Sequence, residues 1–165
     1  MQQGDVVFLD AGTTTLEVAR HLAGRKDLTF ITNGTDIAAC LSSAGVRRLF
    51  VIGGEYSDIN HSLIGPIAVE TILRFNVDKL FLSVSAVDLN RAQIGISLPA
   101  MAATQRAMIE IAQDVIVVAD HTKFGRNALS VVASLDDVDR VVTDRAAAAH
   151  VAALPDTLHR KFIFA

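Results

Sequence analysis

Short apolar runs alternate along this chain with longer stretches that carry apolar residues at helical spacing. Residues 6–9 and 115–119 are wholly apolar, whereas residues 13–23 place Leu16, Ala19 and Leu22 three positions apart. The first pattern is typical of buried strands and the second of amphipathic helices. The other predicted strands are 28–32, 49–52, 79–84, 129–133, 140–143 and 162–164, and the other predicted helices are 36–44, 66–74, 99–113 and 145–153.

The predicted strands are continuous apolar runs rather than alternating apolar and polar positions. Strands of this kind lie in parallel sheets that helices cover on both faces. The sequence therefore predicts one α/β domain over residues 1–165, with three layers and a mostly parallel sheet flanked by helices. Residues 86–98 show no clear period, and we expect loops there and at 120–127.

Composition excludes several classes of protein. Hydrophobic residues make up 51% of the 165 positions, and no apolar run approaches the roughly 20 residues that span a bilayer. The first residues lack the basic and apolar segments of a signal peptide, and a single cysteine excludes an intrachain disulfide. We therefore expect a cytoplasmic protein that does not contact a membrane, in which Cys40 is a buried structural thiol.

Charge argues against direct contact with nucleic acid. The formal net charge is −3, and the basic residues form no run longer than a pair, such as those at 47–48 and 160–161. DNA binding requires clustered positive charge, so we expect this chain on its own to bind DNA poorly. The five histidines lack metal-ligand spacing, and the glycine patterns of nucleotide-binding loops are missing, so we predict neither a metal nor a cofactor.

Four polar segments that contain glycine follow predicted strands. Ligands of open parallel sheets bind beyond the carboxyl ends of the strands, so we expect these segments to face one rim. The segments are residues 10–15, 32–34, 53–54 and 120–125.

The threonines at 13–15 are the most informative of these residues. Hydroxyls and backbone N–H groups at a helix N-terminus favour an anion such as a phosphate or a carboxylate. The alternative is that a threonine simply caps the helix. Lys123 would add a positive charge if its loop shares the rim, and otherwise it is a solvated surface lysine.

Seven motifs occur in a fixed order: FLDAGTTT at residues 8–15, FITN at 30–33, VIGG at 51–54, LIGP at 63–66, DKLF at 78–81, ADHTKFG at 119–125 and VVTD at 141–144. From about residue 5 to residue 145, this series resembles the C-terminal sensor domain of DeoR-family transcriptional regulators. Such domains are similar in fold to ribose-5-phosphate isomerase and the CoA transferases. Family members typically sense phosphorylated sugars or related metabolites, and many repress genes of sugar catabolism.

The resemblance also implies roles for individual residues, and a phosphorylated sugar or similar small anion as the ligand. The implied phosphate end comprises Asp10, Gly12, Thr13, Thr14 and Thr15. The implied lining comprises Thr32, Asn33, Gly53 and Gly54, and the implied sugar side comprises Asp88, Gly95 and Lys123.

Members of this family carry an N-terminal winged helix-turn-helix that reads DNA. Nothing before residue 5 could supply it, so the resemblance implies contact with DNA only through a domain that this chain lacks. Repressors usually read paired half-sites as symmetric dimers, and we expect a homodimer or homotetramer through the present domain.

One stretch departs from the family pattern. Members often carry Glu-Ala-x-x-Lys where this chain has residues 101–105, and the related isomerase uses that glutamate as its base. Met101 cannot move a proton and Gln105 carries no charge, so we do not expect the activity of an aldose–ketose isomerase. A CoA-transferase-like enzyme with Glu55 as nucleophile stays open, as does an oligomerisation module with a vestigial pocket.

Overall fold

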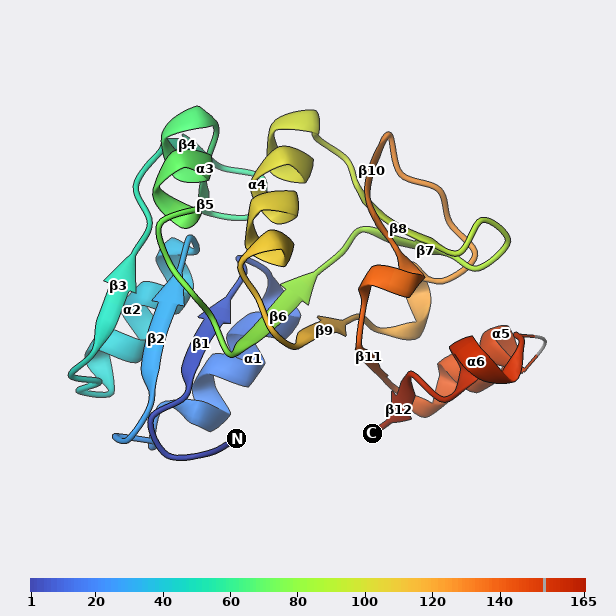
Figure 1. The fold of residues 1–165 in the computed structure, drawn as a ribbon, viewed down its shortest axis with the longest axis horizontal. Coiled ribbons are helices and arrows are strands. Elements are labelled where there is room, and N and C mark those ends of the chain that lie inside the picture. Colours follow the sequence, from blue (N-terminus) through green and yellow to red (C-terminus); the bar gives the residue numbers. More distant parts are fainter. Residues whose placement is uncertain (153) are drawn as a thin grey trace.

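A sheet of seven parallel strands, in the order β12-β11-β9-β6-β1-β2-β3, forms the centre of the computed structural model (Figure 1). The structure describes residues 1–152 and 154–165. The strands of this sheet are β1 (Val6–Leu9), β2 (Thr29–Thr32), β3 (Leu49–Val51), β6 (Lys79–Ser83), β9 (Val115–Val118), β11 (Arg140–Thr143) and β12 (Phe162–Phe164). The helices are α1 (Thr13–Leu22), α2 (Thr35–Ser43), α3 (Pro66–Ile72), α4 (Pro99–Glu110), α5 (Ala148–Val151) and α6 (Asp156–His159).

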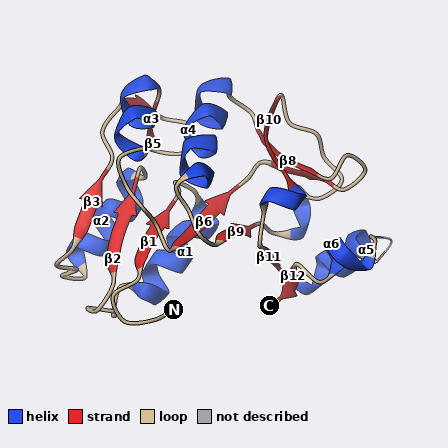
Figure 2. Cartoon of the chain, in the orientation of Figure 1, coloured by secondary structure: helices blue, strands red, loops and turns tan. Residues whose placement is uncertain are grey.

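Helices cover both faces of the sheet, which confirms the predicted three-layer α/β architecture (Figure 2). Successive side chains of a strand point to opposite faces, and β1 shows the consequence. Val7 and Leu9 pack with Ala19 of α1 in one core cluster, whereas Phe8 packs with Met108 of α4 in the other. A strand that is buried on both faces needs a continuous apolar run, as the sequence has at residues 6–9.

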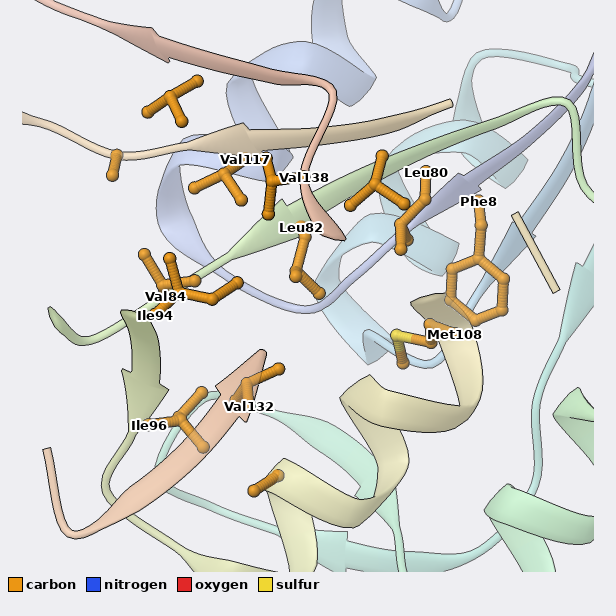
Figure 3. Close-up of a cluster of buried hydrophobic side chains, with 14 of the residues drawn as sticks. Phe8, Leu80, Leu82, Val84, Ile94, Ile96, Met108, Val117, Val132 and Val138 are labelled. Carbon is orange, nitrogen blue, oxygen red and sulfur yellow. The ribbon is translucent and has the colours of Figure 1, made fainter. Parts of the chain in front are cut away.

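The larger core cluster extends from the parallel sheet to a second, smaller sheet. Figure 3 shows Leu80, Leu82 and Val117 of the parallel sheet together with Met108 of α4 and Val132 of the small sheet. The small sheet is antiparallel, in the order β10-β8-β7. Its strands are β7 (Ala86–Asp88), β8 (Gln93–Ile96) and β10 (Ser130–Ser134).

The small sheet corrects two predictions. Residues 86–98, which we expected to form a loop, contain the hairpin of β7 and β8. The predicted strand at 129–133 exists as β10, but it pairs with β8 in the antiparallel sheet rather than with the parallel strands. β7 ends on Asp88, and β8 contains Gln93 and Gly95, so neither strand is the short continuous apolar run by which the other strands were predicted.

Three further features differ from the sequence prediction. A hairpin of β4 (Glu55–Ser57) and β5 (Ser62–Ile64), for which no strand was predicted, lies between β3 and α3. The predicted helix at 145–153 is a 3-10 turn, η3 (Arg145–Ala147), followed by α5, and Ala153 lies outside the described residues. Cys40 is a free thiol on α2 that is half-buried rather than fully buried.

No helix within residues 1–152 and 154–165 has the length and apolar character needed to cross a membrane. Among the same residues, no three histidine, cysteine, aspartate or glutamate side chains are grouped so that they could hold a metal ion.

The strand order reverses between β1 and β6. From β1 the chain moves outward through β2 and β3, and it then crosses back to β6 on the other side of β1. Loops that leave two neighbouring strands in opposite directions open a crevice at the carboxyl ends of those strands. The order of the strands therefore places a crevice beyond Leu9 and Ser83, the last residues of β1 and β6.

Replacing Leu82 by alanine should lower the free energy of unfolding by about 2–5 kcal/mol, because its fully buried side chain belongs to the larger core cluster. Leu129, which is 80% exposed, gives the matched control, and its replacement should change stability by less than about 0.5 kcal/mol. Urea denaturation followed by circular dichroism measures both values. Equal losses in the two variants would contradict the position of the core.

Candidate functional site

A cavity of about 360 Å³ opens at the carboxyl ends of β1 and β6, where the strand order reverses. Its walls come from the loops after β1 and β6, the first turns of α1 and α2, the loop between β4 and β5, the start of α4, and the 3-10 turn η1 (His121–Lys123). Among the residues predicted to bind a ligand, the structure brings together Gly12, Thr13, Thr14 and Lys123 in this cavity.

The N-terminus of α1 is open toward the cavity. The N-cap residue is Gly12, and no side chain in the described part of the chain forms a capping hydrogen bond there. Thr13 and Thr14 line the cavity, whereas Thr15 is fully buried and donates its hydroxyl to the carbonyl of Gly12 at 2.9 Å. The first backbone N–H groups of the helix thus lack a side-chain partner, which is the arrangement that favours an anion.

Only glycine fits at position 12. A Cβ atom at this position would lie 2.7 Å from both Cβ and Oγ of Ser83, at the end of β6. Gly12 and Ser83 both line the cavity, so this close contact connects the two loops that form its floor. The sequence therefore places a glycine where the β1 and β6 loops meet, and any side chain would force them apart.

Lys123 lines the cavity from a different loop, on η1 after β9. Asp120 caps this turn by accepting from the backbone N–H of Thr122 at 2.8 Å, and the backbone N–H of His121 donates to Asp144 at 2.8 Å. The hydrogen bond from the Thr122 hydroxyl holds the pKa of Asp120 below its usual value, and the backbone N–H of His121 does the same for Asp144. Both carboxylates therefore stay charged and fix the turn that presents Lys123.

A buried carboxyl lies beneath the cavity floor. Asp10 follows β1, is only 2% exposed, and accepts at Oδ2 from Gln105 Nε2 at 2.7 Å and from the Ser83 backbone N–H at 3.2 Å. Burial raises the pKa of Asp10 from 3.8 to about 6, although the hydrogen bonds from Gln105 and Ser83 oppose the rise. This residue was predicted to lie at the phosphate end, and the structure places it below that end, outside the cavity lining.

Two of the predicted lining residues are buried beneath the rim and form hydrogen bonds with its loops. Thr32 is fully buried, donates its hydroxyl to the carbonyl of Leu9 at 2.7 Å, and accepts from the backbone N–H of Gly34 at 3.0 Å. Asn33 accepts from the backbone N–H of Ala11 at 3.1 Å and donates to the carbonyl of Leu63 at 3.3 Å. Their side chains satisfy backbone groups of the loops and do not line the cavity.

Four other predicted site residues also lie outside the cavity lining. A Cβ at Gly54 would lie 2.6 Å from the carbonyl oxygen of Ile64, and a Cβ at Gly95 would lie 2.9 Å from that of Ser130, so both glycines permit close strand contacts. Asp88 accepts from the backbone N–H groups that follow it and so closes the β7–β8 turn. Gly53 is exposed in the link between β3 and β4.

The cavity also contains side chains that were not predicted from the sequence. Asp36 and His61 form a contact of 2.8 Å between Oδ2 and Nδ1, which connects α2 to the loop between β4 and β5. Ser83 is the last residue of β6, and Ser85 follows that strand. The rule that ligands bind beyond strand ends could have found both, as it found the glycine segments. The remaining polar lining residues are Asn60 and Ser97.

The residues considered for catalysis are poorly placed for it. Met101 is buried at the start of α4 and lines the cavity at the point where the isomerase base was expected. Glu55, the candidate nucleophile of the CoA-transferase alternative, is exposed on β4 and does not line the cavity. The geometry is suited to holding an anionic molecule and offers no base to it at position 101.

Comparison with known proteins identifies related sequences. A family model described as the DeoR C-terminal sensor domain matches residues 1–145. The chain is 47% identical over 163 residues to the transcriptional repressor AccR of Agrobacterium fabrum, which covers 99% of this chain and 63% of that protein. It is 33% identical over 141 residues to the glycerol-3-phosphate regulon repressor of Escherichia coli, covering 86% of this chain and 56% of that protein.

The chain thus spans somewhat more than half the length of these relatives, both of which are named as repressors and neither as an enzyme. Among solved structures, ribose-5-phosphate isomerase A from Methanocaldococcus jannaschii matches with a TM-score of 0.52 and 14% identity, over 75% of this chain and 48% of that one. The likeness concerns the fold alone, and it confirms the isomerase-like fold that the sequence resemblance implied.

The buried carboxyl of Asp10 should make the stability of the fold depend on pH. Because its pKa rises from 3.8 to about 6 on folding, the folded chain holds this proton more tightly than the unfolded chain does. The resulting stabilisation is fully present below pH 3.8 and is lost as the pH rises through about 6. The loss amounts to about 3 kcal/mol.

Denaturation of the parent chain and of Asp10→Asn between about pH 4 and about pH 7.5 measures this effect. Asparagine stands in for the neutral acid, so the stability of the parent relative to the variant should fall as the pH rises. Taking this difference removes the contributions of the other carboxyls. A difference that stays constant over the range would contradict the raised pKa.

Proposed function

Because this chain belongs to the DeoR C-terminal sensor domain family, we propose that it is the effector-sensing part of a transcriptional regulator. The proposed effector is a phosphorylated sugar or a similar small anionic metabolite, bound in the cavity at the carboxyl ends of β1 and β6. The proposal is carried by one observation: Thr13 and Thr14, at the open N-terminus of α1, and Lys123, on a different loop, line the same cavity.

The anionic end of the ligand lies at the first turn of α1. There the unpaired N–H groups and the positive end of the helix dipole favour a phosphate, and no prior cap has to be displaced. Lys123 adds a charge-assisted contact from the other wall. Ser85 and Ser97 are available to the hydroxyl groups of a sugar, while Ile96 and Met101 give the cavity an apolar side.

The names of relatives support a regulatory role for the whole protein. One of them is named for the regulon of glycerol 3-phosphate, which is a small phosphate ester. Binding would shift the population of arrangements that the regulator adopts, and so change how a DNA-binding part elsewhere in the protein is presented. The net charge of −3 fits a domain that does not contact DNA itself, and the proposal places the regulator in the cytoplasm.

Self-association through this domain belongs to the same proposal, since symmetric operators are read by paired DNA-binding units. Sedimentation of the isolated chain should give a dimer or a tetramer at high micromolar concentration. The added presence of a ligand should change the balance between these forms if sensing works through assembly. A monomer at every concentration would contradict self-association and leave the ligand site unaffected.

Lys123→Ala should weaken binding of a phosphate ester by roughly tenfold to a hundredfold, because it removes a charge-assisted contact. Titration calorimetry with glycerol 3-phosphate and ribose 5-phosphate measures the affinity, with glycerol and ribose as uncharged controls. Lys26→Ala is the matched control variant. Lys26 lies in the loop before β2, at the amino ends of the strands and so away from the cavity, and its ammonium donates to the carbonyl of Ala44, just after α2.

The outcomes separate the parts of the proposal. If Lys123→Ala binds as tightly as the parent chain, the second wall of the site is assigned wrongly. If neither phosphate ester nor other members of a sugar-phosphate panel binds the parent chain, the effector class is wrong. Binding of uncharged sugars with equal affinity would show that the N-terminus of α1 does not receive an anion.

A further inference from the structure

A hydrogen-bonded group of Asp10, Ser83 and Gln105, called the Asp10 cluster below, lies directly under the anion end of the cavity. Gly12 and Ser83 line the cavity floor, and Asp10 is two residues before Gly12. Asp10 Oδ2 accepts from Gln105 Nε2 at 2.7 Å and lies 3.0 Å from Ser83 Oγ. A ligand at the first turn of α1 and the carboxyl of Asp10 therefore lie on the two sides of one short loop.

The hydroxyl of Ser83 has a single proton and two neighbouring acceptors. Its Oγ lies 2.7 Å from the carbonyl oxygen of Ala11 and 3.0 Å from Asp10 Oδ2. One O–H group cannot fully satisfy both. If Asp10 is protonated, its own O–H donates to Ser83 Oγ, and the serine proton is free for Ala11. The geometry is therefore compatible with a protonated Asp10, because both short contacts of the Ser83 hydroxyl are then hydrogen bonds.

The Asp10 cluster contains no cation to stabilise a carboxylate. Gln105 donates two neutral N–H bonds, to Asp10 Oδ2 and to the carbonyl of Ser83, each at 2.7 Å. Its buried Oε1 has no hydrogen-bond partner among the described residues. A neutral amide thus occupies the position from which a positive side chain would hold Asp10 ionised.

Charged groups on the surrounding elements point elsewhere. On α1, Glu17 and Arg20 are exposed and pair with each other, and on α4 the exposed Arg106 donates to the carbonyl of Val131. On β6, Lys79 pairs with Asp114 at the far end of the strand. Around the cavity itself the charged or titratable side chains are Asp36, His61 and Lys123, and none of them forms a hydrogen bond with Asp10.

An anion in the cavity and an ionised Asp10 would repel each other across a region from which water is largely excluded. Protonation of Asp10 removes this repulsion at the cost of one proton taken from solvent. We propose that the cavity binds its anion together with a proton, and that Asp10 is the group that takes up this proton. The inference rests on the proposed function, because it needs an anion at the N-terminus of α1.

The proposal gives the sensor a defined response to pH. Where free Asp10 is ionised, binding draws in a proton, so a rise in pH weakens binding by up to tenfold per pH unit. Where free Asp10 is already protonated, no proton moves and the affinity is independent of pH. The affinity should therefore be level in acid solution and fall on the alkaline side of the titration of Asp10.

Sulfate is the probe for this test, because it is a tetrahedral anion that stays fully ionised over the whole range. Calorimetry in buffers with different ionisation enthalpies counts the protons taken up when sulfate binds near neutral pH. We expect uptake that approaches one proton per site. In parallel, the carboxyl carbon signal of Asp10 in an NMR titration of the parent chain should move to a higher titration midpoint when sulfate is added.

Two variants assign the proton to Asp10, and two others serve as controls. Asp10→Asn and Gln105→Lys should each abolish the uptake, the first by removing the acid and the second by supplying a cation that keeps it ionised. Gln113→Lys controls for the added charge and should retain the uptake. Its site is exposed and lies just before β9, at the amino ends of the strands and so away from the cavity. His61→Gln should also retain it, which would exclude the cavity histidine as the group that takes up the proton.

Each outcome bears separately on the role of Asp10 and on the proposed function. Sulfate binding without proton uptake, or an uptake that persists in Asp10→Asn and disappears in His61→Gln, would overturn the role of Asp10 and leave the anion site intact. If sulfate and the sugar phosphates both fail to bind, the proposed function fails as well. The NMR titration uses the parent chain, so a midpoint for Asp10 that sulfate does not move overturns the inference even if the variants fold poorly.

Discussion

The reversal of strand order between β1 and β6 is the constraint on which the rest of the site depends. Neighbouring parallel strands normally send their connections to the same side, which leaves no gap between them. Here β1 leads into α1 and β6 leads toward the small antiparallel sheet, so the two loops separate beyond the strand ends. The contact between Gly12 and Ser83 keeps the floor of that gap closed, while its upper part stays open.

Polar residues of the rim have one of two roles, and the exposure of the side chain distinguishes the two groups. Thr32 and Asn33 are buried, and their side-chain hydrogen bonds go to backbone groups of the loops. A loop at the end of a buried strand has backbone groups that water cannot reach, and these side chains satisfy them. Thr13, Thr14 and Lys123 are at least partly exposed and line the cavity. The first set gives the rim its shape, and the second leaves donors free.

Local patterns in the sequence were sufficient to predict the parallel strands and the threonine loop. A strand that is buried on both faces needs a continuous apolar run, and the start of a helix favours particular residue types, so both can be recognised from the residue order. The position of Asp88 and Gly95 was not accessible in this way. Both follow β6 in sequence, but the chain turns there into an antiparallel hairpin, so their segment leaves the rim. Gly53 and Gly54 follow a real strand, yet β3 is the outermost strand of its side and lies away from the reversal. Strand order is a long-range property, and no short segment encodes it.

The same reasoning explains why one fold serves both isomerases and sensors. Strand order fixes where a ligand can lie, whereas the chemistry depends on a few side chains around that place. In this chain the start of α4 contributes Met101 to the cavity wall and Gln105 to the buried carboxyl of Asp10. A thioether cannot accept the proton that an isomerase must remove, and an amide cannot hold a buried carboxylate ionised as a lysine would. Both residues fit the proposed binding site better than a reacting one, and in that proposal Asp10 is the group whose charge responds to what enters the cavity.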